Sequence, residues 1–162
     1  MGDGGAFQGI AARLEYPIYI VTATDGIELS GCLVGFATQC SINPVRFLTC
    51  ISDKNHTYRV AGRTDALAVH LVPADGQRLA ELFGGATGDS GDKFERCSWT
   101  EGPAGLPILT DCPSWFAGHV VERITLGDHA GYMLEPFAGE AGGDGSQYPA
   151  ARARAIAPGH EA

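Results

Sequence analysis

An Asp-Gly pair at residues 25 and 26 constrains the fold of this chain more than any other feature. It separates two apolar segments, residues 16–24 and 28–36, which are rich in β-branched and aromatic side chains. Such residues favour strands, and Asp-Gly supplies the positive φ angles of a tight turn between antiparallel strands. We therefore predict a β-hairpin over residues 16–36.

The rest of the pattern adds more strands and little helix. Strand-like segments follow at residues 46–51, 66–72, 114–121 and 130–136. One short helix is predicted over residues 57–62. A second starts at Asp75, a good N-cap, and stops at Gly84-Gly85. Many short strands with one or two short helices predict a mostly β fold, a closed or nearly closed antiparallel barrel.

The length of 162 residues fits one domain with a core of its own. Residues 1–9 are rich in glycine, and we expect them to be flexible. The compact domain is expected to span residues 10–138. Residues 139–162 are rich in glycine, alanine and arginine, with too few large apolar side chains to offset the entropy of ordering. We therefore expect a flexible tail there.

Charge and cysteine usage exclude several classes of protein. The net charge of −8 makes nucleic acid and acidic membrane surfaces poor partners. No apolar stretch approaches the roughly 20 residues that span a bilayer, and the N-terminus lacks the features of a secretory signal. The five cysteines form no Cys-x-x-Cys pair, and the histidines show no metal-ligand spacing. We expect free thiols, no metal and a cytoplasmic protein.

Polar side chains gather at two places that a single predicted strand separates. The first group is Thr38, Gln39, Cys40 and Ser41, and the second is Ser52, Lys54, Asn55 and Thr57. Strand pairing can bring both groups to one cleft. Hydroxyls, amides and a lysine suit a ligand that carries a phosphate and a polar, flat ring system.

Residues 31–44, GCLVGFATQCSINP, resemble the flavin-binding segment of the flavin reductase-like family. In that family a glycine opens the strand, Thr and Ser residues follow, and Ser-x-Asp/Asn-Pro closes it. Similar motifs then follow in the family's order. They are a polar turn at residues 54–57, Asp92-Lys93-Phe94, GLPIL at residues 105–109 and Gly127-Asp128-His129. The resemblance covers residues 16–136.

The resemblance implies a Greek-key split β-barrel of the FMN-binding type and a homodimer that holds FMN or FAD. It implies an NAD(P)H-dependent flavin reductase, a class that includes the reductase components serving a partner monooxygenase. Two alternatives stay open: a flavin-binding or electron-carrier module without turnover, and a deazaflavin-dependent reductase. Leu33 and Gly35 stand where the family often has Thr and a small polar residue, so the choice among FMN, FAD and deazaflavin is open. An excess of apolar residues over segment 16–36 also favours a dimer.

The resemblance gives each candidate residue a role. Thr38, Gln39 and Ser41 are expected to contact the flavin ring edge or the ribityl chain, with Cys40 beside them. The phosphate falls to Ser52, Lys54, Asn55 and Thr57, at what we expect to be a helix N-terminus. Phe94 packs over the flavin or nicotinamide, or is a plain core aromatic. His129, oriented by Asp128, positions the nicotinamide, or is structural.

Overall fold

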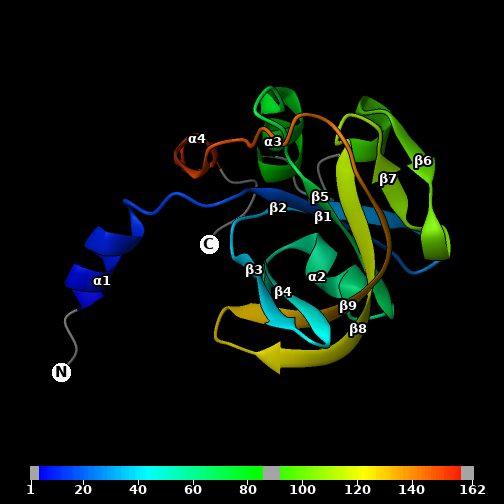
Figure 1. The fold of residues 1–162 in the computed structure, drawn as a ribbon, viewed down its shortest axis with the longest axis horizontal. Coiled ribbons are helices and arrows are strands. Elements are labelled where there is room, and N and C mark those ends of the chain that lie inside the picture. The colour runs from blue at the N-terminus through cyan, green and yellow to red at the C-terminus, as the bar shows by residue number, and fades with distance from the viewer. Residues whose placement is uncertain (1–3, 86–91, 158–162) are drawn as a thin grey trace.

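The computed structural model describes residues 4–85 and 92–157. Its main element is a seven-stranded sheet in the order β2-β1-β5-β8-β9-β4-β3, with every neighbouring pair antiparallel (Figure 1). The strands are β1 (Tyr19–Thr24), β2 (Leu29–Val34), β3 (Ala37–Ile42), β4 (Val45–Ser52), β5 (Ala66–Leu71), β8 (Ser114–Thr125) and β9 (His129–Ala141). The predicted mostly β, split-barrel fold is confirmed.

The predicted hairpin is present as β1 and β2. The carboxylate of Asp25 accepts hydrogen bonds from the backbone N–H groups of Ile27 and Glu28, each at 2.9 Å. Gly26 has a φ angle of 88°, which a glycine adopts without strain. Local turn chemistry thus sets the register from Tyr19 opposite Val34 to Thr24 opposite Leu29.

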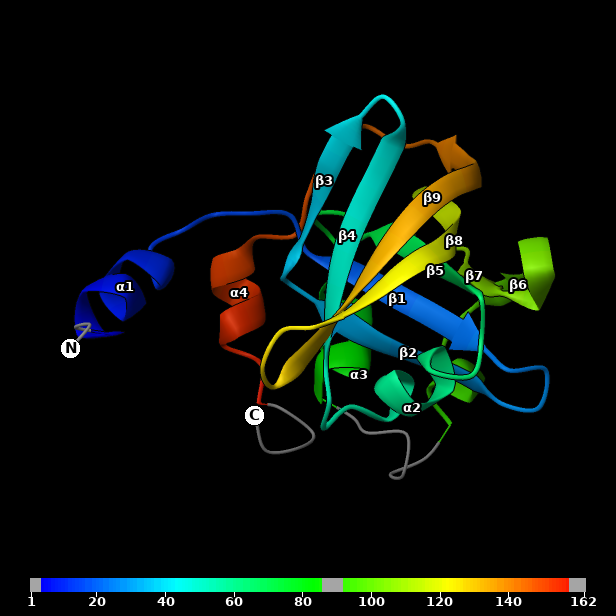
Figure 2. The same ribbon diagram turned by 90° about the horizontal axis from the view of Figure 1, so that it is seen from below.

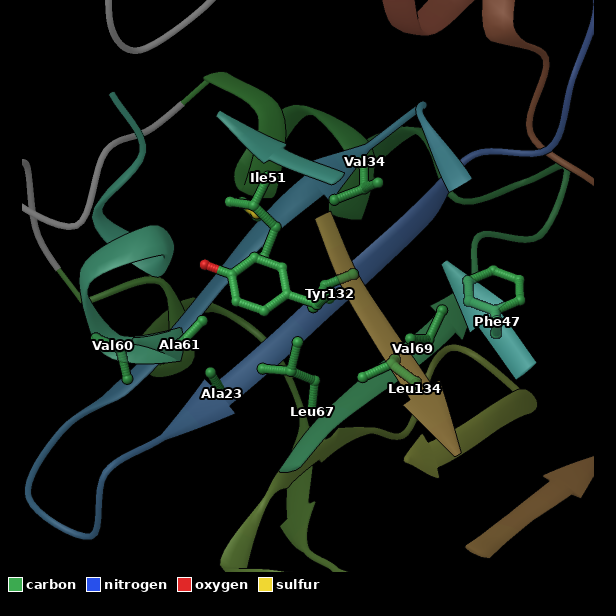
Figure 3. Packing of buried hydrophobic residues seen from close by; sticks show 12 residues of the cluster. Ala23, Val34, Phe47, Ile51, Val60, Ala61, Leu67, Val69, Tyr132 and Leu134 are labelled. Atoms are coloured by element: carbon green, nitrogen blue, oxygen red, sulfur yellow. The ribbon is translucent and has the colours of Figure 1, made fainter. Parts of the chain in front are cut away.

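The sheet curls around a buried core to which strands from both of its ends contribute. Cys32 and Val34 come from β2, while Phe47 and Ile51 come from β4. Tyr132 of β9 lies in the middle of this core (Figure 3), and α2 (His56–Ala61) covers one side with Val60 and Ala61. The curling brings the ends of β2, β4 and β9 near one another, and this positions the site described below.

A second core lies on the outer face of β1 and β2, under α3 (Gln77–Gly85) and the 3-10 turn η2 (Lys93–Arg96). Ile18 and Ile20 pack there with Phe83. A Cβ on Gly31 would lie 2.8 Å from the Phe83 ring, so glycine is required for this close approach. Part of the apolar excess of segment 16–36 therefore packs within the chain, whereas Phe36 at its end stays 59% exposed.

A small sheet of β6 (Trp99–Glu101) and β7 (Pro107–Leu109), joined through η3 (Pro103–Gly105), is tied to the barrel by the fully buried His70. Leu109 N–H donates to Nε2 of His70 at 3.1 Å, so Nδ1 carries the proton and donates to the Ile20 carbonyl at 2.9 Å. Burial lowers the pKa of His70 to about 4, which keeps the ring neutral.

The C-terminal part of the described chain differs from the expectation of a flexible tail, and the N-terminal part contains a helix. Residues 4–11 form a helix, α1 (Gly4–Ala11), with no buried residue, and it stands away from the barrel in Figures 1 and 2. Past residue 138, β9 continues to Ala141 and α4 (Ala150–Arg154) follows. Tyr148 is fully buried in the second core, and its N–H donates to the Val72 carbonyl at 2.9 Å. This aromatic side chain supplies the packing that the tail's composition did not indicate.

The expectations for residues 1–3 and 158–162 lie outside the described residues. Within residues 4–85 and 92–157, no helix is long and apolar enough to cross a membrane.

Candidate functional site

A cleft of about 280 Å³ opens where β2, β4 and β9 come together. Its apolar walls are formed by Ile18, Leu33, Val34, Phe36 and Ile51. The polar or charged groups that line it are Tyr16, Ser52, Asn55, His129 and Arg154. An apolar slot with a few convergent polar groups is typical of a small-molecule site.

Strand register brings two of the predicted site residues together. Ser52 at the end of β4 lies opposite His129 at the start of β9, and Asp53 N–H donates to the Asp128 carbonyl at 2.9 Å. Nδ1 of His129 lies 2.7 Å from the carboxylate of Asp128. Its ring centroid is 5.2 Å from that of Phe36. The hydrogen bond from His129 lowers the pKa of Asp128, so this carboxylate is charged and orients the ring.

The predicted phosphate residues separate into two groups. Ser52 and Asn55 line the cleft, and Lys54 is exposed beside them, with its N–H donating to Ser52 Oγ at 3.3 Å. Thr57 instead is fully buried, with its hydroxyl 2.8 Å from Ser30 Oγ. Its N–H donates to the Asn55 carboxamide oxygen at 3.0 Å, the N-cap bond of α2. The side chain of Thr57 therefore has no exposed surface for a phosphate.

The first predicted group does not line the cleft. Thr38, Gln39, Cys40 and Ser41 lie on β3, an edge strand that the sequence pattern did not predict because it lacks alternating apolar residues. Thr38 and Gln39 bond within the strand: the hydroxyl of Thr38 donates to the Gln39 carbonyl, and the amide of Gln39 to the Ser41 carbonyl, both at 3.1 Å. The residues of this segment that do reach the cleft come earlier, at 32–36.

Phe94 lies in the second core, not in the cleft. It is 5% exposed and makes edge-on ring contacts with Phe83 and Trp99. Lys93 before it is also buried, and its ammonium donates to the carbonyl oxygens of Gly31 at 3.0 Å and Phe83 at 3.3 Å. Burial lowers the pKa of Lys93. The Asp-Lys-Phe motif thus supports β2 on its outer face, and the interpretation of Phe94 as a core aromatic fits this structure.

Tyr16 and Arg154 reach the cleft without having been predicted. The Arg154 guanidinium lies over the Tyr16 ring, 5.7 Å from its centroid, and donates to the Leu14 carbonyl at 3.0 Å. A Cβ on Gly35 would lie 3.0 Å from the Tyr16 ring, so the glycine lets this ring come close. No sequence signal pointed to Arg154, because it falls in the segment expected to be a flexible tail.

The chemistry that these residues offer is binding and positioning. Burial raises the pKa of Cys32 to about 11, and it also raises that of Cys50, so both thiols in the cleft are protonated at neutral pH and are poor nucleophiles. Among the described cleft residues, none forms a nucleophile–base pair. The apolar walls suit a flat ring system, and Arg154 offers positive charge beside them.

A split antiparallel barrel with such a cleft at its strand ends defines the class of flavin-binding split-barrel proteins. The model of the flavin reductase like domain matches residues 11–154, and the chain belongs to this family. This confirms the resemblance found in the sequence.

Relatives and solved structures agree with this assignment. The chain is 30% identical over 131 residues to a protein named FMN reductase (NADH) RutF of Methylorubrum extorquens, covering 78% of this chain and 62% of that one. It is 26% identical over 136 residues to the 4-hydroxyphenylacetate 3-monooxygenase reductase component of Pseudomonas aeruginosa, covering 80% and 77%. The crystal structure of a flavin reductase domain protein from Arthrobacter sp. FB24 is similar with a TM-score of 0.80, at 25% identity, over 90% of this chain and 89% of that one.

Proposed function

We propose that this protein is a flavin reductase that transfers a hydride from NAD(P)H to FMN or FAD. The observation that carries the proposal is the pairing of Ser52 with His129 beside an apolar cleft in a chain of this family. The name of the RutF relatives, FMN reductase (NADH), supports NADH as donor and FMN as acceptor.

The cleft residues fit a flavin. Leu33, Phe36 and Ile51 supply apolar walls for the ring, and Ser52 and Asn55 supply hydrogen-bonding groups at one end. The volume of about 280 Å³ lies just below the roughly 300–1,000 Å³ of typical ligand pockets. The cleft therefore takes the ring, and the phosphate of FMN extends toward Ser52 and the exposed Lys54.

The chain's own contribution to hydride transfer is positioning. When bound, the flavin supplies the hydride acceptor, and the hydride passes to it directly from the nicotinamide, so no protein acid or base is required. His129, held by Asp128, lies at the cleft where it can orient the nicotinamide over the flavin.

Leu33 favours a flavin that binds weakly and exchanges with the solution. Leu33 lines the cleft at a position where the family often supplies a hydroxyl, and its side chain also packs against the second core, so one hydrogen bond to the flavin is absent. A weakly held flavin behaves as a substrate, and its reduced form is free to reach a partner monooxygenase. The reductase component among the relatives supports such a partner.

Exposed apolar residues support a homodimer. Ile42 is 81% exposed, Phe36 59% and Val45 51%, all on or beside the β3–β4 hairpin, and Phe7 of α1 is 69% exposed. A second copy that covers them would also place β3, with Thr38 and Gln39, against the partner.

The five free thiols fit a cytoplasmic location.

The test is NADH oxidation by the purified protein with and without added FMN. We expect little bound yellow chromophore and fast oxidation once FMN or FAD is present. A tightly bound flavin with little turnover would instead favour the electron-carrier alternative. Reduction only of a deazaflavin would favour the third class and overturn the proposal.

A further inference from the structure

A second cavity, of about 740 Å³, lies between α3 and α4, separate from the cleft. Three arginines line it: Arg78 from α3, Arg96 from η2 and Arg152 from α4. These elements come from distant parts of the sequence, and Figure 1 shows α4 beside α3. The cavity is called the arginine groove below.

The charge of the arginine groove opposes that of the whole chain, which is −8. Among the described residues, none of the three arginines forms an ion pair with a carboxylate. Glu81 is the acidic residue that lines the groove, and it accepts a hydrogen bond from Gln77 at 2.5 Å. Three guanidinium groups against a single carboxylate leave a net positive charge, which suits an anion with more than one charge.

Contacts with the protein hold two of the guanidinium groups in place. Arg78 donates to the backbone carbonyl of Arg96, and the Arg152 guanidinium lies 5.1 Å from the centroid of the Tyr148 ring. Tyr148 in turn is fully buried, and its hydroxyl donates to Gln77 at 2.6 Å. Guanidinium groups held in this way lose less conformational entropy on binding a ligand than free ones do.

The groove also has an apolar side, formed by Leu82 of α3 and by Ile156 just after α4. Phosphate-sized anions alone need no such surface, but a nucleotide base does. The helix α4 is a shared wall: Arg152 lines the groove, while Ala153 and Arg154 line the flavin cleft. A nucleotide in the groove would therefore lie on the opposite side of one short helix from the cleft.

We propose that the arginine groove binds an adenosine diphosphate group, with the diphosphate at the arginines and the base against Leu82 and Ile156. FAD and the nicotinamide dinucleotides both carry this group. The choice between these two sources rests on the proposed function, whereas the binding of the group itself rests on the groove alone.

The first experiment titrates the full-length protein with ADP by isothermal calorimetry. The wild-type protein should bind ADP, and the double variant Arg78→Gln/Arg152→Gln should bind it at least about tenfold more weakly, since two charge-assisted contacts are lost. The matched control is Arg13→Gln, an exposed arginine outside the groove, which should bind as the wild type does. Adenosine without phosphates should bind at least about tenfold more weakly than ADP.

Two results would overturn the proposal: no ADP binding by the wild-type protein at millimolar concentration, or equal binding by the wild type and the double variant. Thermal melts check that the variants are folded. If the double variant is not, Arg96→Gln gives the same comparison from a different element.

The second experiment identifies the source of the group by steady-state kinetics. If FAD supplies it, the double variant has a raised KM for FAD and an unchanged KM for FMN. If the nicotinamide dinucleotide supplies it, the KM for NADH rises with either flavin. A protein that binds ADP but oxidises no NADH with any flavin would contradict the proposed function while leaving the groove assigned.

Discussion

Ser52 and His129 face each other across β4 and β9, although they lie 77 positions apart in the chain. The pairing places a hydroxyl and an imidazole at the mouth of one apolar cleft. A hydrogen bond of 2.9 Å from Asp53 N–H to the Asp128 carbonyl holds the two strand ends together. The geometry of the cleft mouth therefore depends on both strands, and substitutions at these positions report on it.

Changing His129 to Ala tests its positioning role. We expect FMN affinity to change little and kcat/KM for NADH to fall about tenfold or more, because a lost hydrogen bond is worth roughly 1–2 kcal/mol. Stopped-flow flavin reduction with NADH and with NADPH measures this. Asp128→Asn, which keeps the size but weakens the hold on the ring, should show a smaller loss of the same kind. Wild-type rates with both donors in a folded His129→Ala variant would make His129 structural.

Lys54 and Thr57 should respond differently, although both belong to the predicted phosphate group. Lys54→Ala removes an exposed ammonium at the rim, and FMN affinity should fall by about 10- to 100-fold, since a charge-assisted bond contributes roughly 1.5–3 kcal/mol. Thr57→Val removes a buried hydroxyl bonded to Ser30, so it should lower stability by about 1–2 kcal/mol. Flavin titration and chemical denaturation measured on both variants separate the two effects. Unchanged FMN affinity in Lys54→Ala would place the phosphate elsewhere.

Leu33→Thr restores a hydroxyl at a cleft position. We expect the variant to bind FMN more tightly, by about 2- to 10-fold, because a neutral hydrogen bond contributes roughly 0.5–1.5 kcal/mol. Leu33→Val, which shortens the side chain without a hydroxyl, is the control for packing. Equal affinities for the Thr and Val variants would show that no flavin atom accepts or donates at this position. Fluorescence quenching of FMN provides the measurement.

Features that local interactions determine were predicted from the sequence, whereas features that depend on long-range contacts were not. Asp25-Gly26 encodes its turn locally, so the first hairpin was predicted correctly. The motif order identified the family. The polar residues of β3 were expected in the cleft because they stand out in the sequence, but the chain leaves the cleft after Phe36. Whether the residues before or after Phe36 face the cleft depends on how the strands pair, and the local sequence does not reveal that pairing.

The tail was the larger failure. Its order depends on Tyr148, which is buried in the second core and bonds to Val72 and Gln77, more than 60 positions earlier in the chain. Composition alone cannot show such a long-range contact. Arg154 and Arg152, which line the cleft and the arginine groove, were missed for the same reason.

The exposed side of the β3–β4 hairpin predicts the oligomeric state. We expect a dimer at micromolar concentration by light scattering, and a shift toward monomer in Ile42→Asp, because Ile42 is 81% exposed in a single chain and a buried carboxylate without a partner is costly. Ile27→Asp is the matched control, since Ile27 is 93% exposed at the β1–β2 turn, away from that hairpin. A wild-type monomer with flavin bound would contradict the homodimer.

His70 predicts how stability depends on pH. In the folded protein its pKa is about 4, below its ordinary 6.5, because the ring is buried. Above pH 6.5 the ring is neutral in both states and its contribution is complete. As the pH falls from about 6.5 toward 4, the unfolded chain takes up a proton that the folded chain does not, so the free energy of unfolding should fall by roughly 3 kcal/mol through this group. Denaturant unfolding followed by circular dichroism across this range measures the loss.

His70→Gln should be less stable at pH 7, since it disturbs the bonds to Ile20 and Leu109, but should lose less stability on acidification. The control is His119→Gln, which changes an exposed ring stacked on Phe137 and leaves the bonds of His70 in place. Parallel stability curves for the wild type and His70→Gln would show that His70 is not the group that titrates.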